Sequence, residues 1–167
     1  MENWLAVYTK RRCEKKVVNL LAKKNLESYS PLNRIIRVKT NVRDQITVPL
    51  FSSWVFVRAT EADQDIVLGT EGIVSFLFWR GKPAIIPDTE MSLLQHFVTQ
   101  HSSISLQKID ATPEETWGKR RNKTLAANNK DTSSPDELYT SISLPSIGYT
   151  LTAQVVEGSR PLIRSMT

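Results

Sequence analysis

The stretch PLFSSWVFVR, residues 49–58, carries apolar side chains on both faces of a predicted strand. Counting in twos places Trp54 and Phe56 on one face, whereas Val55 and Val57 point to the other. An antiparallel strand with one face in water alternates apolar with polar residues instead. The segment therefore predicts a strand that is covered on both sides, either by other parts of the chain or by a separate molecule.

The composition is typical of one globular domain with room for a small second module. The chain has 167 residues, of which 40% are hydrophobic and 23% charged. Its longest apolar run, near residues 73–79, is far too short to span a bilayer, so no membrane contact is expected. The N-terminus lacks the charge pattern of a signal peptide, and the lone Cys13 cannot form an internal disulfide. We therefore expect a cytoplasmic protein.

Positive charge is concentrated in the first third of the chain. The formal net charge is +5, but the segment from Lys10 to Arg43 holds eleven Lys or Arg residues against only two acids, Glu14 and Glu27. Such a concentration suits a polyanion, because each neutralised phosphate releases condensed counterions. The cluster taken alone fits a solvated surface equally well.

A second strand with the same pattern is predicted at residues 4–9, followed by a basic amphipathic helix with an apolar stripe from Cys13 to Leu21. Because Cys13 lies on that stripe, it is expected to be a buried structural thiol. Two β-rich runs flank the polar residues 41–44, which is typical of a basic β-hairpin leading directly into residues 54–58.

The predicted N-terminal domain spans residues 1–101. It is completed by a short helix at residues 61–68, a strand at 73–79, and a helix from Asp88 to about Gln100. The buried face of that last helix is predicted to consist of Met91, Leu94, Phe97 and Val98.

The C-terminal third is polar at first and then regains strand character. Residues 102–137 predict a linker or a poorly ordered segment, because they contain few large apolar residues to bury. Residues 138–167 contain two strand-like runs around PSIG, which predict a hairpin. Two strands alone are rarely stable in water, so this region needs a partner surface.

No group of residues suits catalysis. His96 and His101 are five residues apart and would diverge by about 140° on a regular helix. No Cys or acid is spaced to join them as metal ligands. Neither a nucleophile elbow nor a long phosphate-binding glycine loop is present. We therefore expect no enzyme, no cofactor and no bound metal.

In their order along the chain, these segments resemble the N-terminal domain of the NusG family of transcription elongation factors. The resemblance covers about residues 3–100. PLFSSWVFV stands where the family has Phe-Pro-x-Tyr-aliphatic-aliphatic-Val, and GIVSFLFWRGKPAIIP is similar to the family's Gly-Val-x-x-Phe-Val segment. The spacing and the KPAIIP ending resemble specialised paralogues of the RfaH and UpxY type, antiterminators of capsule or exopolysaccharide operons. The implied fold is α+β, an α/β sandwich whose mainly antiparallel sheet is flanked by helices.

The resemblance implies a partner for the aromatic face. In the family this surface docks on the clamp helices of the largest RNA polymerase subunit, which assigns polymerase binding here to Tyr8, Phe51, Trp54 and Phe56. Val55 and Val57 would pack beneath the protein's own helices, and Trp4 would be structural. From the pattern alone, rings in the domain's own core are the simpler interpretation. The resemblance instead favours rings that face outward as an apolar cavity.

The resemblance also implies that the start of the basic helix faces the exposed nontemplate DNA strand. It assigns nucleic-acid binding to Lys10, Arg11, Arg12, Lys15, Lys16 and Thr70, with nascent RNA as a further candidate partner. Glu71 stands where relatives can carry a basic residue, so the sequence that is read is expected to differ. The implied function is that of a monomeric elongation regulator or antiterminator. The alternative is a stand-alone nucleic-acid-binding module whose rings are internal.

The C-terminal third departs from the family pattern. Family members usually end in a KOW module, a small SH3-like barrel that begins with a Val-x-Val-x-x-Gly-Pro-x-x-Gly loop. Residues 142–155 (ISLPSIGYTLTAQV) resemble only the later strands of that barrel, and residues 116–135 contain no Gly-Pro loop. We therefore expect a degenerate KOW-like β region at residues 138–167. Contact with ribosomal protein or termination factor stays open.

Overall fold

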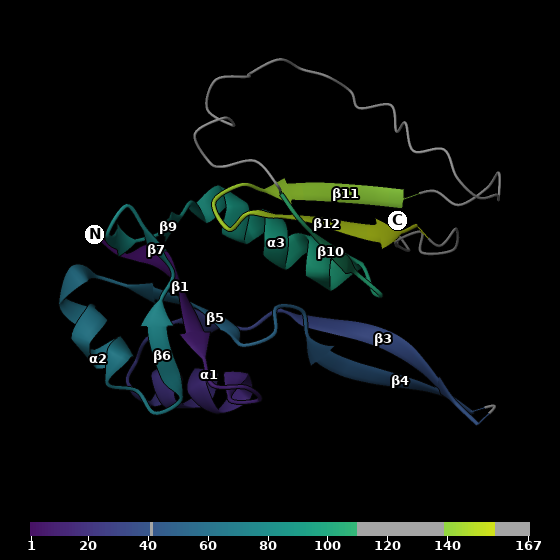
Figure 1. The fold of residues 1–167 in the computed structure, drawn as a ribbon, viewed down its shortest axis with the longest axis horizontal. Coiled ribbons are helices and arrows are strands. Elements are labelled where there is room, and N and C mark those ends of the chain that lie inside the picture. Colours follow the sequence, from purple (N-terminus) through teal and green to yellow (C-terminus); the bar gives the residue numbers. More distant parts are fainter. Residues whose placement is uncertain (41, 110–138, 156–167) are drawn as a thin grey trace, which may run out of the picture.

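The structure, a computed structural model, describes residues 1–40, 42–109 and 139–155. Its elements are arranged in three layers (Figure 1). Helices α1 (Glu14–Lys23) and α2 (Gln64–Leu68) lie on one side of a central sheet. Helix α3 (Asp88–Gln100) and a C-terminal sheet lie on the other side. The fold is α+β with antiparallel sheets, as the sequence predicts.

The central sheet is built around the two strands with apolar faces. Its order is β2-β5-β1-β6, and β9 also pairs with β1. Every pairing is antiparallel, and the register places Val7 opposite Val55 and Tyr8 opposite Trp54. The strands are β1 (Asn3–Thr9), β2 (Ser28–Tyr29), β5 (Trp54–Ala59), β6 (Ile73–Phe76) and β9 (Ile85–Ile86).

One face of this sheet packs against α1 and α2. Val55 and Val57 are fully buried and share a core cluster with Val17 and Leu21 of α1 and Val67 of α2. The β-branched strand residues fit the pleat, whereas the i, i+4 spacing of the helix places its apolar stripe against them. The prediction that these valines pack beneath the protein's own helices is confirmed.

The opposite face packs against α3 and the C-terminal sheet. Trp4, Phe51 and Phe56 share a second core cluster with Leu94 of α3 and Leu151 of the C-terminal sheet. The burial expected for the α3 stripe and for Trp4 is confirmed. Both faces of the central strand are therefore covered by the described part of the chain itself.

The C-terminal sheet has the order β10-β12-β11 and includes a strand that sequence reasoning missed. It consists of β10 (Ser105–Lys108), β11 (Tyr139–Leu144) and β12 (Tyr149–Gln154). The linker predicted from residue 102 is wrong for β10, because Leu106 pairs with Leu151 and packs against the core. The rest of the predicted linker, residues 110–137, lies outside the described residues.

A buried side chain fixes the segment between α3 and β10. Asn33 donates a hydrogen bond to the Ile104 carbonyl at 2.8 Å, and its side-chain oxygen accepts one from the Ile104 N–H at 3.0 Å. Asn33 thus satisfies both backbone groups of a buried residue, which would otherwise be left unpaired. This pairing ties β10 to the base of the preceding hairpin.

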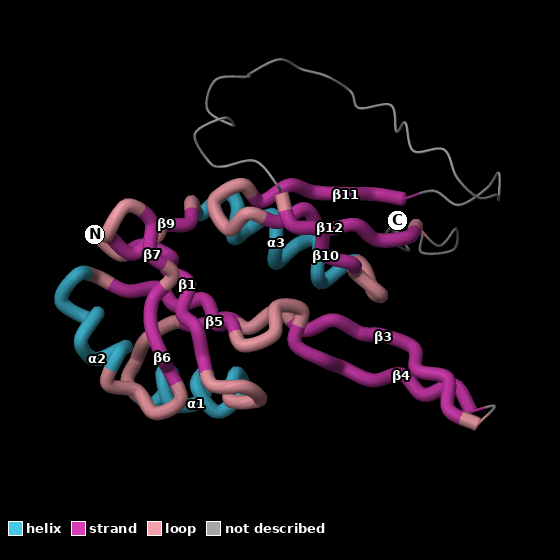
Figure 2. The backbone as a smooth tube through the Cα atoms, viewed as in Figure 1, coloured by secondary structure: helices cyan, strands magenta, loops and turns pink. Residues whose placement is uncertain are grey.

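Two hairpins extend from the sheet. The basic hairpin β3 (Leu32–Lys39) and β4 (Val42–Pro49) projects away from the body (Figure 2). A shorter hairpin joins β7 (Phe78–Trp79) to β8 (Lys82–Pro83). The strand predicted at residues 73–79 is therefore interrupted at Leu77. No helix in the described ranges is long and apolar enough to cross a membrane.

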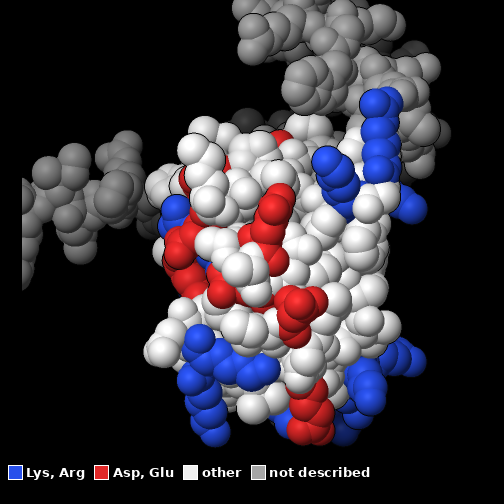
Figure 3. Space-filling view, turned by 90° about the vertical axis from the view of Figure 1, so that its left-hand side faces the viewer, with Lys and Arg blue, Asp and Glu red and all other residues white. Residues whose placement is uncertain are grey.

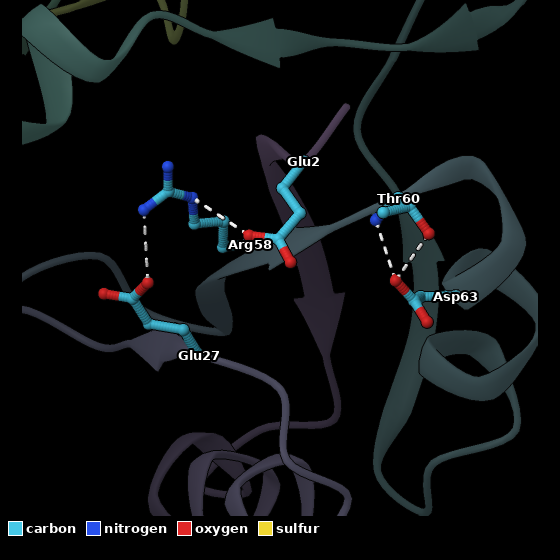
Figure 4. Close-up of polar contacts among 5 residues, drawn as sticks. All are labelled: Glu2, Glu27, Arg58, Thr60 and Asp63. Atoms are coloured by element: carbon cyan, nitrogen blue, oxygen red, sulfur yellow. Dashed lines mark hydrogen bonds and ion pairs between the residues drawn. The ribbon is translucent and has the colours of Figure 1, made fainter.

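Polar contacts hold the C-terminal end of β5 and the turn that follows it (Figure 4). Arg58 lies between Glu2 and Glu27, with nitrogen–oxygen distances of 3.6 and 3.5 Å. Asp63 accepts hydrogen bonds from the Thr60 hydroxyl at 2.6 Å and the Thr60 N–H at 2.9 Å. These bonds lower the pKa of Asp63 and cap the short helix η1 (Glu61–Asp63) that leads into α2.

Candidate functional site

The four predicted docking rings form one aromatic cluster. Tyr8 and Trp54 are register partners on β1 and β5, and their ring centroids lie 5.0 Å apart in an edge-to-face arrangement. Phe51 lies 6.0 Å from Trp54 and 5.7 Å from Phe56. Such separations are in the favourable range for aromatic pairs. The structure therefore brings together the rings that the sequence singled out.

These rings differ in exposure, and this corrects the expectation of four outward-facing side chains. Tyr8 and Trp54 are half-buried, whereas Phe51 is only 3% exposed and Phe56 is fully buried. The inner pair is covered because α3 and the C-terminal strands pack on this face of the sheet. Polymerase binding by these residues stays a prediction.

A fifth ring, which sequence reasoning missed, completes the cluster. Tyr149 at the start of β12 lies 5.5 Å from Phe51 and 6.1 Å from Trp54, in edge-to-face arrangements. Burial raises the pKa of Tyr8, and the nearby Tyr149 raises it further. The sequence signal was the tyrosine that opens the alternating run YTLTAQ, but no local pattern indicates which surface that run covers.

The C-terminal sheet is also held by a polar contact on α3. Glu90 accepts a hydrogen bond from the Ser146 hydroxyl at 2.8 Å and another from the Ser146 N–H at 3.2 Å. Ser146 lies in the turn between β11 and β12. The cover over the inner rings therefore combines apolar packing with one carboxylate that binds the turn.

The predicted basic cluster lies beside the aromatic cluster. Lys10, Arg11, Arg12, Lys15 and Lys16 are all exposed. Backbone bonds fix the loop that carries the first three: Thr9 N–H donates to the Ser53 carbonyl and Lys10 N–H to the Gly72 carbonyl, both at 2.8 Å. Because Lys10 follows Tyr8 by two residues, the cationic loop adjoins the accessible aromatic pair.

Lys16 differs from its basic neighbours because it has an acidic partner. Its ammonium group lies 2.6 Å from a carboxylate oxygen of Glu71, and both side chains are largely exposed. The hydrogen bond raises the pKa of Lys16 and lowers that of Glu71. A phosphate that binds Lys16 would have to compete with this carboxylate.

Thr70, the remaining predicted nucleic-acid contact, is buried. Its hydroxyl accepts a hydrogen bond from Lys24 at 2.8 Å and donates one to the Ile66 carbonyl at 2.9 Å. Lys24 also donates to that carbonyl at 3.1 Å, so these groups complete the C-terminal end of α2. This arrangement does not support a nucleic-acid contact from the Thr70 side chain, because its hydroxyl is already paired inside the protein.

Charge is unevenly distributed on the face seen from the left-hand side of Figure 1. In Figure 3, acidic side chains gather toward the middle of that face, whereas basic side chains lie nearer its margins. A polyanion is therefore expected to follow the margins of this face and to avoid its centre.

The two histidines lie in different surroundings. His96 is exposed, and the His101 ring lies 4.5 Å from the Phe97 ring. Across residues 1–40, 42–109 and 139–155, no three His, Cys, Asp or Glu side chains gather in a way that could hold a metal ion. Cys13 is half-buried against the α1 core cluster.

The family is identified by one comparison with known proteins, the match to a sequence profile. The sequence profile described as "Transcription termination factor nusG" matches residues 2–95. A solved structure entitled "Domain interaction in Thermotoga maritima NusG" is similar at 19% sequence identity and a TM-score of 0.45, covering 66% of this chain and 74% of that chain. No curated protein sequence matches this one.

Proposed function

This chain belongs to the NusG family of transcription elongation and termination factors, and on that premise we propose that it binds the clamp helices of the largest RNA polymerase subunit. NusG-family factors interact with RNA polymerase. We further propose that it contacts the nontemplate DNA strand and suppresses pausing or termination. Its action is then one of binding alone, without a chemical step.

The observation that carries this proposal is the adjacency of an accessible aromatic pair and a cationic loop. Tyr8 and Trp54 pack edge to face at 5.0 Å, and Lys10 follows Tyr8 by two residues, directly after the end of β1. Aromatic side chains are the commonest anchors of protein interfaces, whereas Lys and Arg neutralise phosphates. A surface of this kind suits a partner made of protein and nucleic acid together.

The inner rings become available only if the C-terminal sheet leaves. Phe51 and Phe56 are covered by α3 and by the strands that carry Leu144, Leu151 and Tyr149. We propose that polymerase binds first to the outer pair and then displaces this sheet from the aromatic cluster. The Glu90–Ser146 contact opposes that displacement.

We also propose that the effect is confined to particular operons, of the capsule or exopolysaccharide type. This part of the proposal is supported by the KPAIIP ending, residues 82–87, which resembles that of specialised paralogues, and by Glu71, which stands where relatives can carry a basic residue. A cationic loop alone positions the phosphate backbone, so sequence preference needs additional contacts to bases.

Single-round transcription in vitro tests the function. Purified polymerase transcribes templates that differ only in the leader sequence, with and without the full-length protein. Shorter pauses or more read-through on one leader and no change on the others support an operon-specific regulator. Equal pausing with and without the protein on every leader, despite stable binding to polymerase, would contradict the proposed activity.

A second candidate function is favoured by the burial of Phe51 and Phe56. If this burial persists in the presence of polymerase, the chain acts as a nucleic-acid-binding module with internal rings. That alternative predicts salt-dependent binding to single strands without any binding to polymerase. The two candidates are therefore separated by polymerase binding alone, because both share the basic surface.

A further inference from the structure

The short hairpin β7–β8 presents an exposed tryptophan between two cations, away from the basic loop. The Leu77 N–H donates to the Ala6 carbonyl at 2.8 Å, which fixes the base of this hairpin beside the middle of β1. Ala6 precedes Lys10 by four residues, so the strand rise separates the hairpin base from the basic loop by about 14 Å. The two regions are distinct places on the molecule.

Trp79 is 45% exposed, although a large aromatic ring is usually much more buried. The Arg80 guanidinium carbon lies 5.9 Å from the centroid of the Trp79 ring, within the range of a cation–π contact. Lys82, which is exposed, is the cross-strand partner of Trp79, so the two side chains lie on the same face of the hairpin. The ring is therefore flanked by two positive charges.

The backbone of the turn marks Arg80 as an unusual position. Arg80 has a φ of 49° and Gly81 a φ of 79°, so both central residues of this two-residue turn have left-handed backbone conformations. Asn, Asp or Gly is strongly preferred at the first of these positions. An arginine there is unfavourable for the turn itself, and strain of this kind commonly marks a functional position.

We propose that Trp79 is a stacking platform for one base of a single-stranded nucleic acid, with Arg80 and Lys82 binding the adjacent phosphates. Every base has a π face, so stacking requires a single strand but no particular sequence. Cations beside an exposed ring favour a polyanion over an apolar protein surface. This contact lies beyond the basic loop and does not require docking on polymerase.

Phe78 offers a matched control within the same hairpin. It is 55% exposed, but adjacent strand residues point to opposite faces, so its ring lies on the face away from Trp79 and Lys82. Phe78 instead makes an edge-to-face contact with Phe76 of β6, at 6.4 Å. Removing either ring deletes a similar exposed aromatic surface, but only one removal is expected to affect stacking.

The test is fluorescence anisotropy of the full-length protein with labelled oligonucleotides of about twelve nucleotides, oligo-dT and oligo-rU, and with a DNA duplex. Trp79→Ala is expected to weaken binding of single strands about ten-fold, whereas Trp79→Phe and Phe78→Ala stay within about two-fold of the parent. The logarithm of the binding constant falls linearly with the logarithm of the salt concentration, and Arg80→Gln and Lys82→Gln are each expected to make this slope shallower by about 0.7. The two oligonucleotides report whether DNA or RNA is preferred.

Three outcomes would overturn this inference: Trp79→Ala binds single strands like the parent, Trp79→Ala and Phe78→Ala lose affinity equally, or Trp79→Ala loses as much affinity for the duplex. Polymerase binding by the same variants separates this inference from the proposed function. Retained polymerase binding with lost oligonucleotide binding supports the stacking site. Lost polymerase binding with intact oligonucleotide binding shows instead that Trp79 contacts protein.

Discussion

Glu14 accepts a hydrogen bond from the backbone N–H of Ser53 at 2.6 Å, which ties the first turn of α1 to the loop that carries Phe51 and leads into Trp54. Glu14 is buried, and Ser53 has a left-handed backbone with a φ of 63°. The carboxylate therefore holds a strained loop in place. Through this bond the basic helix and the aromatic cluster keep a fixed relation to each other.

Replacing this carboxylate is expected to destabilise the fold. Glu14→Ala leaves the Ser53 N–H without its partner and should lower the free energy of unfolding by about 1–3 kcal/mol. Glu14→Gln retains an acceptor oxygen and should lose less. Urea unfolding measures both, with the exposed Lys15→Ala as the control that stays near the parent. An unchanged midpoint for Glu14→Ala would show that the bond does not stabilise the loop.

Gly72 is expected to be a position where only glycine fits. Its φ is 97°, and a Cβ there would lie 3.0 Å from Cγ2 of Val17 and 3.4 Å from Cβ of Cys13. Gly148 has a φ of 74° with open space around it, so Gly148→Ala adds backbone strain alone, about 1 kcal/mol. Gly72→Ala should cost about 1–3 kcal/mol more in unfolding free energy because α1 must also shift. Equal losses for the two variants would contradict the predicted clash.

The raised pKa of Tyr8 makes stability depend on alkaline pH. Because the folded state favours the protonated phenol, the stabilisation from Tyr8 is fully present below its ordinary pKa of about 10. This stabilisation is lost as the pH rises from the ordinary pKa through the higher pKa that Tyr8 has in the folded protein. NMR of ring-labelled tyrosine should show Tyr8 titrating above 10 in the parent and somewhat lower in Tyr149→Phe, because burial remains the larger cause.

The control for that titration is Tyr139→Phe, at the end of β11 where Tyr139 pairs with Gln154, outside the aromatic cluster. It should leave the titration of Tyr8 unchanged. Titration of Tyr8 at or below its ordinary pKa in the parent would mean that the aromatic cluster is open to water.

Weakening the contact between α3 and the C-terminal turn is expected to strengthen polymerase binding. Glu90→Ala removes both hydrogen bonds to Ser146, so the C-terminal sheet is displaced more easily and binding should tighten several-fold. Glu61→Ala, an exposed acid on η1, is the matched control and should bind like the parent. Hydrogen exchange of β12 should accelerate in Glu90→Ala alone. Unchanged or weaker binding despite faster exchange would argue against displacement.

Local patterns in the sequence predicted most of the N-terminal elements. The alternation in residues 4–9 and 54–59 and the stripe from Val17 to Leu21 reflect contacts within one sheet and its helices. Helix α3 begins at Asp88, directly after Pro87, because a proline inside a helix removes a backbone hydrogen bond and clashes with the preceding turn. These features depend on residues that are neighbours in sequence.

The unpredicted features depend on contacts between distant segments. Phe51 and Phe56 are buried because strands more than eighty residues later cover them, and β10 is a strand only because β12 pairs with it. The sequence predicts that Thr70 is an exposed loop residue. In the structure its hydroxyl is buried at the end of α2, where it accepts a hydrogen bond from Lys24, a residue distant in sequence. Periodicity carries no information about such pairings.

The proposed attachment to RNA polymerase depends most on the outer aromatic pair, Tyr8 and Trp54. The direct measurement is equilibrium binding of core polymerase by the full-length Tyr8→Ala, Trp54→Ala double variant, with its folding checked by urea unfolding and Phe78→Ala as the control. Aromatic anchors contribute about 2 kcal/mol each or more, so binding should weaken at least several hundred-fold while the control matches the parent. A folded double variant that binds polymerase as tightly as the parent would contradict attachment through this pair.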